Sequence, residues 1–179
     1  MRDMKNHLFA VLLALLATGC ASLIPVSSYK DKAFPTVSGK NLEGQEVQLP
    51  AAVAGEPAIL LIAYKQNAQF DVDRWALGLA QAKVDAKLLE VPTITGFVPS
   101  LLSGTINSGM REGIPSEDWR SVVTVFEDGE KIQAMLGNEN PRNAQVVVLN
   151  REGKMIWFDN RGYSPRLALE VKTLIEEMR

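Results

Sequence analysis

The sequence predicts an α/β domain with a mixed sheet flanked by helices, preceded by an export signal and a short tether. The run "AILLIAY", residues 58–64, is apolar between Pro57 and Lys65, as expected for a strand buried on both faces. Segments with apolar residues three or four apart alternate with further apolar runs, which indicates helices packed on a sheet. The last two runs, 145–149 and 154–158, are joined by the turn "NREG" and predict a closing hairpin.

The first half of the domain contains a predicted edge hairpin, the buried strand and a helix. Residues 41–49 have the turn residue Gly44 followed by alternating apolar and polar residues, a pattern typical of a short hairpin. A helix is expected over 71–86, with Asp71 as its N-cap and Asp73 in the first turn, where the helix dipole favours an acid. Its apolar face would contain Trp75, Leu79 and Ala82.

The second half adds strands over 88–94 and 121–126 and a helix over 99–113 between them. Leucine, isoleucine and methionine four residues apart support that helix, and "EDGE" after the third strand predicts a turn. The final helix begins at Ser164 and Pro165, because serine is a favoured cap and proline a favoured first residue. Its apolar stripe comprises Leu167, Val171, Leu174, Ile175 and Met178.

The N-terminal segment predicts a lipid anchor. Residues 8–17 are apolar but too few to span a bilayer, which needs about 20, and their place near the start is typical of a signal peptide. "LATGC", residues 16–20, resembles the bacterial lipobox, which implies cleavage after Gly19 and lipid on Cys20. Because Ala21 follows, analogy with enterobacterial lipoproteins favours the outer membrane, facing the periplasm. An ordinary signal peptide or short anchor with an incidental cysteine is the alternative.

The predicted organisation is a signal peptide over 1–19, a lipidated tether over 20–33 and one domain over 34–179. The whole chain has 179 residues and a formal net charge of −2. It has no basic run or stripe, so nucleic acid is not an expected partner.

Cysteine and histidine each occur once in the chain, as Cys20 and His7. After cleavage and lipidation the mature chain would have neither a free thiol nor an imidazole. The commonest general base, metal ligand and thiolate nucleophile are then missing. We therefore expect no metal or other cofactor and no catalysis by a Ser-His-Asp triad.

The order of the predicted strands and helices resembles a thioredoxin-like domain with an insert, over most of residues 34–179. In redox members of this group the reactive cysteine lies between the buried strand and the following helix. The equivalent stretch here is "KQNAQFDVDRW", residues 65–75, and it contains no cysteine. The resemblance therefore implies a thioredoxin-like domain without thiol redox chemistry.

A second, local resemblance concerns "MREGIPSEDW", residues 110–119, and "IWFDNRGYS", residues 156–164. Together they are similar to the mitochondrial ATP synthase assembly factor family with a thioredoxin-like domain. The resemblance implies a non-catalytic module that serves a partner protein, although a lipoprotein would face the periplasm, away from ATP synthase assembly. The matching positions are Met110, Arg111, Ile114, Pro115, Glu117, Ile156, Trp157 and Gly162.

These motifs define a candidate surface for a partner or ligand. Arg111, Arg142 and Arg161 can converge at one end of the sheet and bind a carboxylate or phosphate, or each can pair with a nearby acid or with water. Trp119 is the tryptophan expected to be exposed, whereas the other two fit apolar faces. The full predicted surface is Arg111, Ile114, Pro115, Glu117, Trp119, Arg142 and Arg161.

Three polar groups have a second interpretation. Asp71 and Asp73 can form an acid–base pair or act as helix cap and dipole partner. With Asp128 they can in principle bind a hard cation, but no calcium-loop spacing is present. Lys65 can serve as a desolvated base or extend into water.

The sequence thus predicts a membrane-anchored envelope protein with a redox-inactive thioredoxin-like domain that binds or assembles another envelope protein. The contact surface would use residues 110–119 and the region after "AILLIAY". Two alternatives stay open: a periplasmic carrier of a small acidic ligand, and an enzyme that uses carboxylates or lysine.

Overall fold

A computed structural model describes residues 29–95 and 100–178 of the chain. The predicted signal peptide, Cys20 and most of the predicted tether lie outside the described residues.

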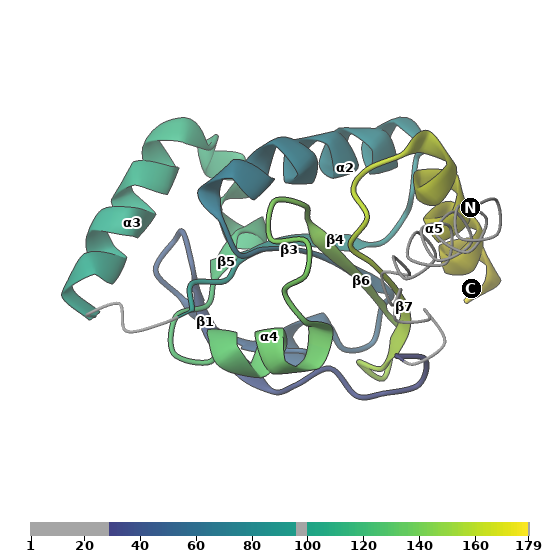
Figure 1. The fold of residues 1–179 in the computed structure, drawn as a ribbon, viewed down its shortest axis with the longest axis horizontal. Helices are drawn as coiled ribbons and strands as arrows, with labels where there is room; N and C mark the ends of the chain where they lie inside the picture. Colours follow the sequence, from purple (N-terminus) through teal and green to yellow (C-terminus); the bar gives the residue numbers. More distant parts are fainter. Residues whose placement is uncertain (1–28, 96–99, 179) are drawn as a thin grey trace, which may run out of the picture.

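A mixed four-stranded sheet forms the centre of the domain (Figure 1). Its middle strand β3 has five fully buried side chains and one that is half-buried, which confirms the strand predicted from "AILLIAY". β3 pairs in parallel with β4 and antiparallel with β6, and β6 pairs antiparallel with β7. The order is β4-β3-β6-β7, and the strands are β3 (Ala58–Ala63), β4 (Lys87–Pro92), β6 (Gln145–Leu149) and β7 (Met155–Asp159).

A second sheet extends the first one beyond β4. It contains the predicted hairpin and a two-residue strand, in the order β2-β1-β5. Parallel bridges from Glu90 to Val122 and from Thr93 to Val125 join it to β4. The third predicted strand is therefore shorter than expected as a regular strand, although bridges extend its pairing. The strands are β1 (Val37–Asn41), β2 (Glu46–Leu49) and β5 (Val123–Thr124).

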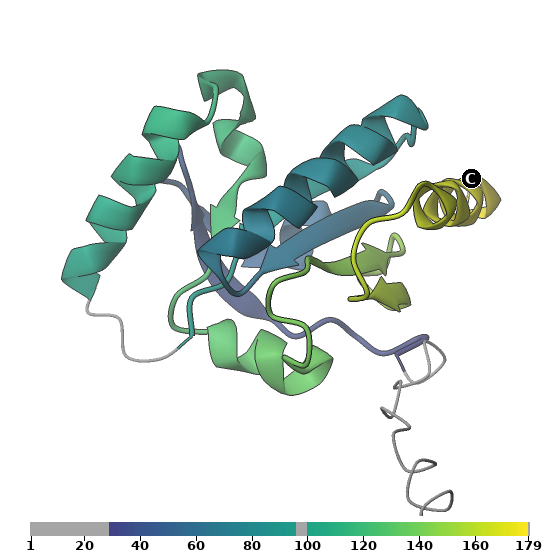
Figure 2. The same cartoon turned by 45° about the horizontal axis from the view of Figure 1, so that its top comes forward.

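Helices cover both faces of the sheet (Figures 1 and 2). α2 (Gln69–Gln81) and α5 (Pro165–Glu177) pack on one face, where Trp75 and Trp157 lie in a common core cluster. α4 (Gly129–Leu136) covers the other face through Ile132 and Leu136. Short 3-10 turns occur at η2 (Ala51–Val53), η3 (Gln66–Ala68) and η4 (Ser116–Ser121).

The segment between β4 and β5 contains helix α3 (Ser100–Gly113) and η4. This confirms the helix predicted over 99–113. In both views α3 lies at the β1 and β5 end of the molecule, far from α5 (Figures 1 and 2).

One local prediction was wrong, and one helix was not predicted. Asp71 is not the N-cap of α2, because the helix begins at Gln69 and no side chain caps it. The turn predicted from "EDGE" is present at residues 127–128, but it leads into the unpredicted helix α4, whose first residue is Gly129. An eight-residue helix with two fully buried side chains, Ile132 and Leu136, shows too short an apolar pattern to be distinguished from a turn.

The cap of the last helix was predicted correctly. Ser164 lies at the N-cap of α5, its hydroxyl accepts a hydrogen bond from the Leu167 amide at 3.3 Å, and Pro165 follows.

The last residues of the expected tether pack against β7. The Tyr29 ring lies 4.7 Å from the ring of Phe158. The Asp31 amide donates to the Met155 carbonyl, and the Met155 amide donates to the Lys32 carbonyl. Ordered packing of the domain therefore extends back to Tyr29.

Gly78 of α2 provides a test of how closely this helix packs. A Cβ atom at this position would overlap the ring of Tyr163, which packs edge-on against Trp75 with ring centroids 5.6 Å apart. Although alanine favours a helix over glycine by about 1 kcal/mol, we expect Gly78→Ala to destabilise the full-length chain by about 1–3 kcal/mol, because overpacking dominates. Urea unfolding measures this change.

Gly104→Ala in α3 is the matched control, since nothing lies within 4 Å of a Cβ there. It should be neutral or stabilising. Equal effects of the two substitutions would contradict the close contact between Gly78 and Tyr163.

Candidate functional site

The junction between β3 and α2 carries no group that can attack a disulfide or a peroxide. It consists of Lys65, the 3-10 turn η3 and the start of α2 at Gln69. Lys65, Gln66 and Asn67 are exposed and Ala68 is buried. Amide and ammonium side chains offer hydrogen bonds and charge at this place, but no thiolate.

A buried carboxylate fastens α2 to two distant loops. Asp71 is only 1% exposed. Its Oδ2 accepts a hydrogen bond from the Ala144 amide at 3.0 Å, and its Oδ1 accepts one from the Tyr163 amide at 2.9 Å. Arg74 donates to Oδ1 at 2.8 Å. All these bonds join Asp71 to Arg74 and to the backbone of the two loops, which is a structural role.

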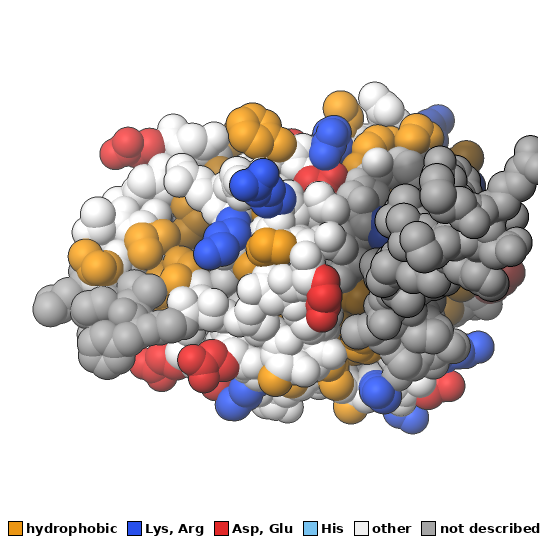
Figure 3. Space-filling view, viewed as in Figure 1, with side chains coloured by type: hydrophobic (Ala, Val, Ile, Leu, Met, Phe, Trp, Pro, Cys, Tyr) orange, Lys and Arg blue, Asp and Glu red, His pale blue; other side chains and the backbone are white. Residues whose placement is uncertain are grey.

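These bonds bring two of the predicted arginines to the same end of the sheet. Arg142 and Arg161 each lie two residues before an amide that donates to Asp71. The Asn143 side chain also donates to the Asn160 carbonyl at 3.0 Å, which joins the two loops. Figure 3 shows Lys and Arg side chains next to each other over the start of α2.

The two arginines differ in their partners. Arg161 forms an ion pair with Asp159, whose carboxylate is buried. The Arg161 amide donates to Asp159 Oδ1 at 2.8 Å and its Nε donates to Oδ2 at 2.7 Å. Hydrogen bonds and charge from Asp159 hold the pKa of Arg161 above its usual range. Arg142 is exposed and forms no ion pair with any residue in 29–95 or 100–178.

Arg111 does not join this pair. Its Nε donates to the Leu42 carbonyl, directly after β1, at 2.6 Å. With β5 bridged to β4, strand β1 lies four strands from β6, a separation of about 19 Å at 4.8 Å per strand. The structure thus places side by side the loops that carry two of the three arginines expected to converge.

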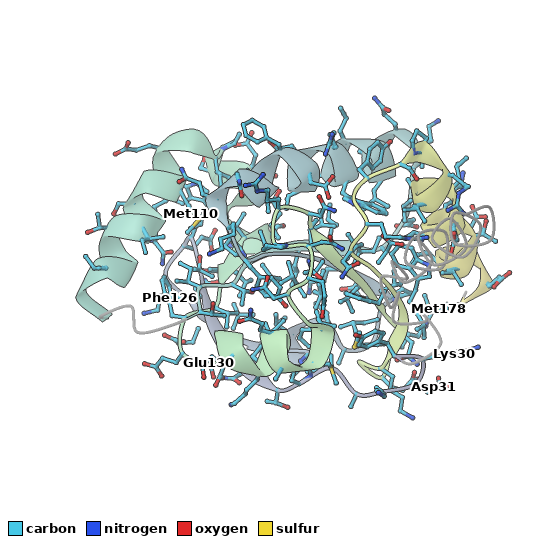
Figure 4. All side chains as sticks on the ribbon, in the orientation of Figure 1. Lys30, Asp31, Met110, Phe126, Glu130 and Met178 are labelled. Carbon is cyan, nitrogen blue, oxygen red and sulfur yellow. The ribbon has the colours of Figure 1, made fainter. Side chains whose placement is uncertain are left out.

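The predicted surface over residues 110–119 is partly used for packing. The Arg111 guanidinium lies 5.5 Å from the centre of the Trp119 ring, and the Trp119 indole donates to the Ile114 carbonyl at 2.9 Å. Trp119 is half-buried, whereas Pro115 and Glu117 are exposed. Figure 4 shows Met110 on the side of α3 turned toward the sheet. Only part of this predicted surface is therefore free to contact a partner.

The sequence analysis did not identify Glu90, a residue of β4 whose carboxylate contacts Gln69 at the start of α2. Gln69 donates to Glu90 Oε2 at 3.4 Å and to Asp73 Oδ1 at 2.8 Å. Burial, followed by repulsion from Asp73 and Asp118, raises the pKa of Glu90 against the lowering effect of the Gln69 hydrogen bond. The available signal was the one charged residue within the mostly apolar run "LLEVPTI".

Neither a metal centre nor a membrane-spanning helix is found in the part of the chain that the structure describes. No group of three or more His, Cys, Asp or Glu side chains there is arranged to hold a metal ion. None of the helices in that part is both long and apolar enough to cross a bilayer.

The role of Asp71 is tested by Asp71→Asn. The amide retains one acceptor and turns N–H donors toward backbone amides, which leaves a buried donor unsatisfied. We expect a loss of about 3 kcal/mol in unfolding free energy, measured by urea denaturation of the full-length chain. Asp73→Asn is the control, because Asp73 is exposed and only two residues from Asp71. It should change the unfolding free energy by less than about 0.5 kcal/mol. Similar losses from the two variants would contradict the anchoring role.

The burial of Glu90 predicts a pH-dependent effect of Glu90→Gln. Because the pKa of Glu90 is raised from 4.5 in the fold, the folded chain binds this proton more tightly than the unfolded chain. That contribution to stability is present below about pH 4 and is lost as the pH rises through the raised pKa. The melting temperature of Glu90→Gln should therefore exceed that of the wild type at pH 7, and the gap should close toward pH 4.

The exposed Glu112→Gln serves as the control for a general charge effect. A gain at pH 7 that is equal in both variants, or that persists unchanged at pH 4, would contradict the assignment to burial.

Comparison with known proteins shows the fold and no family. No protein-family model matches the sequence, and no curated protein matches it either. The resemblance to the ATP synthase assembly factor family therefore gains no support from these comparisons.

Solved structures are similar to the chain at low sequence identity. The putative electron transfer protein of Aquifex aeolicus VF5 has a TM-score of 0.58 and 19% identity, covering 83% of this chain and 95% of that one. The lipoprotein thioredoxin Etrx1 of Streptococcus pneumoniae TIGR4 has a TM-score of 0.54 and 11% identity. The match covers 78% of this chain and 99% of Etrx1. A SCO1/SenC family lipoprotein of Bacillus anthracis Ames has a TM-score of 0.54 and 10% identity. The match covers 83% of this chain and 95% of that one. The described domain therefore has a thioredoxin-like α/β fold.

Proposed function

We propose that this chain is a lipid-anchored envelope protein whose thioredoxin-like domain binds or helps assemble another envelope protein without thiol redox chemistry. The observation that carries the proposal is the junction after β3. There, Lys65 to Gln69 occupy the place of the reactive cysteine in redox relatives, and the one cysteine of the chain is Cys20. A thioredoxin-like domain without a reactive cysteine at this place would act by binding another protein and not by thiol chemistry.

The anchor part of the proposal rests on the resemblance of "LATGC" to a lipobox. Buried acyl groups contribute about 0.8 kcal/mol per CH₂, and two or more chains hold a protein stably on a membrane. The described packing reaches Tyr29, and the nine residue steps from Cys20 to Tyr29 span at most about 32 Å. The domain would thus work close to its membrane, and Ala21 favours the outer one.

Two of the structural neighbours support this combination of anchor and fold. Etrx1 and the SCO1/SenC family protein are both lipoproteins with the same fold. The assembly role itself is drawn from residues 110–119 and 156–164, and we transfer only the idea of a non-catalytic module, not the ATP synthase.

A carrier of a small acidic ligand is the second candidate. The proximity of Arg142 and Arg161 favours it, because guanidinium groups bind carboxylates through paired hydrogen bonds. A thermal-shift screen of the full-length chain with acidic metabolites separates the candidates. A clear rise in melting temperature supports the carrier, and an unchanged one supports the protein-binding module.

The chemical state of Cys20 tests the leading proposal. In a Gram-negative host we expect the mature chain to begin at Cys20 and to carry the mass of a diacylglycerol and an amide-linked acyl chain by intact-mass spectrometry. Maleimide should label the mature protein under neither oxidising nor reducing conditions. Cys20→Ser should lack the lipid and lose membrane attachment. A mature form with an unmodified Cys20 whose labelling changes with redox conditions would refute the proposal.

A further inference from the structure

The exposed face of α2 carries two large apolar side chains in one row. Phe70 is 76% exposed and Leu77 is 60% exposed. They are seven residues apart, so they lie on the same face of the helix, and Arg74 lies between them. Single exposed apolar residues are ordinary, and larger apolar patches bordered by polar groups are typical of contact surfaces. We call Phe70, Arg74 and Leu77 the α2 ridge.

Basic groups border this ridge on the side of the Asp71 anchor. Arg74 donates to Asp71, and Asp71 binds the loops that carry Arg142 and Arg161. Lys65 joins them because β3 ends beside the start of β6, where Ile62 pairs with Gln145. Figure 3 shows hydrophobic side chains beside Lys and Arg side chains along this part of the molecule. We call Lys65, Arg74, Arg142 and Arg161 the basic edge.

Two of the acids near the basic edge are buried, two lie beside the ridge on its other side, and two, Glu139 and Glu170, are exposed. Glu170 is already paired with Arg166 and Trp157. Asp71 and Asp159 are 1% and 3% exposed, whereas the side chains of their partners Arg74 and Arg161 are 62% and 50% exposed. Asp73 borders the ridge on the side opposite Arg74, being three residues after Phe70 and four before Leu77, and it shares the hydrogen bonds of Gln69 with Glu90. Lys65 and Arg142 form no ion pair within the described residues. The four exposed cations therefore outnumber the two exposed acids, Glu139 and Glu170, at this edge.

From this arrangement, and resting on the binding role proposed above, we infer that the α2 ridge and the basic edge dock an acidic segment of the partner protein. Guanidinium groups pair with carboxylates, and the exposed Phe70 and Leu77 require apolar side chains in the same segment. Aromatic residues and arginine are also the residues enriched at interface hot spots. The apolar ridge favours a protein segment over a free anion.

Site-specific photo-crosslinking in the full-length chain in cells tests this inference. A photoreactive residue replaces Leu77 on the ridge, Glu117 on the other predicted surface, or Leu169, a 57% exposed control on α5. We expect a crosslink from position 77 to a protein, with a net negative charge on the crosslinked peptide identified by mass spectrometry. No such product should form from position 169.

Charge reversal at unpaired, exposed positions supplies the second arm. Arg142→Glu and Lys65→Glu should each reduce the crosslink from position 77 at least tenfold. Arg151→Glu, an exposed residue in the turn between β6 and β7, should leave it unchanged. A synthetic copy of the crosslinked peptide should bind the purified full-length chain more weakly as salt increases, because exposed charges are screened.

The outcomes separate this inference from the proposed function. A protein crosslink from position 117 but not from 77 overturns the inference and leaves the binding role standing. The absence of a protein crosslink from both positions contradicts both. A crosslink from 77 to lipid, to a neutral or basic peptide, or one unaffected by Arg142→Glu also overturns the inference.

Discussion

The carboxylate of Asp71 is the interaction on which the candidate site depends. It is buried, and it accepts hydrogen bonds from two backbone amides that lie 73 and 92 residues further along the chain. Hydrogen bonds to a charged acceptor contribute more than neutral ones, and an unpaired buried group is expensive. The first turn of α2, the loop before β6 and the loop after β7 are therefore held in one arrangement, with basic side chains on its outer side.

Local sequence patterns predicted the parts of the fold that local physics determines. "AILLIAY" forms a buried strand because its side chains are apolar on both faces. Ser164 and Pro165 start a helix because serine caps the first turn and proline is favoured as its first residue. Asp71 was misassigned as a cap because its partners are remote in the sequence. α4 was missed because eight residues with Ile132 and Leu136 at its core contain little periodic signal.

The same distinction applies to the candidate site. The missing thiol after β3 and the basic character of Arg142 and Arg161 are visible in the sequence. The position of Arg111 is not, because its partners Leu42 and Trp119 come from an edge hairpin and from η4. The exposure of Phe70 and Leu77 could not be predicted either, since apolar residues on a helix usually face the core.

The proposed function depends on the residues that follow β3, where this chain has Lys65 to Gln69 and no cysteine. In this domain the hydrogen bonds of Asp71 fix the start of α2 against the two neighbouring loops, and the proposed contact surface is built on that arrangement. Hydrogen exchange at the Ala144 and Tyr163 amides tests this most directly. The account predicts that both exchange as slowly as amides in β3 and β6 and lose that protection in Asp71→Asn. Exchange as fast as at the exposed turn residue Arg151 would contradict it.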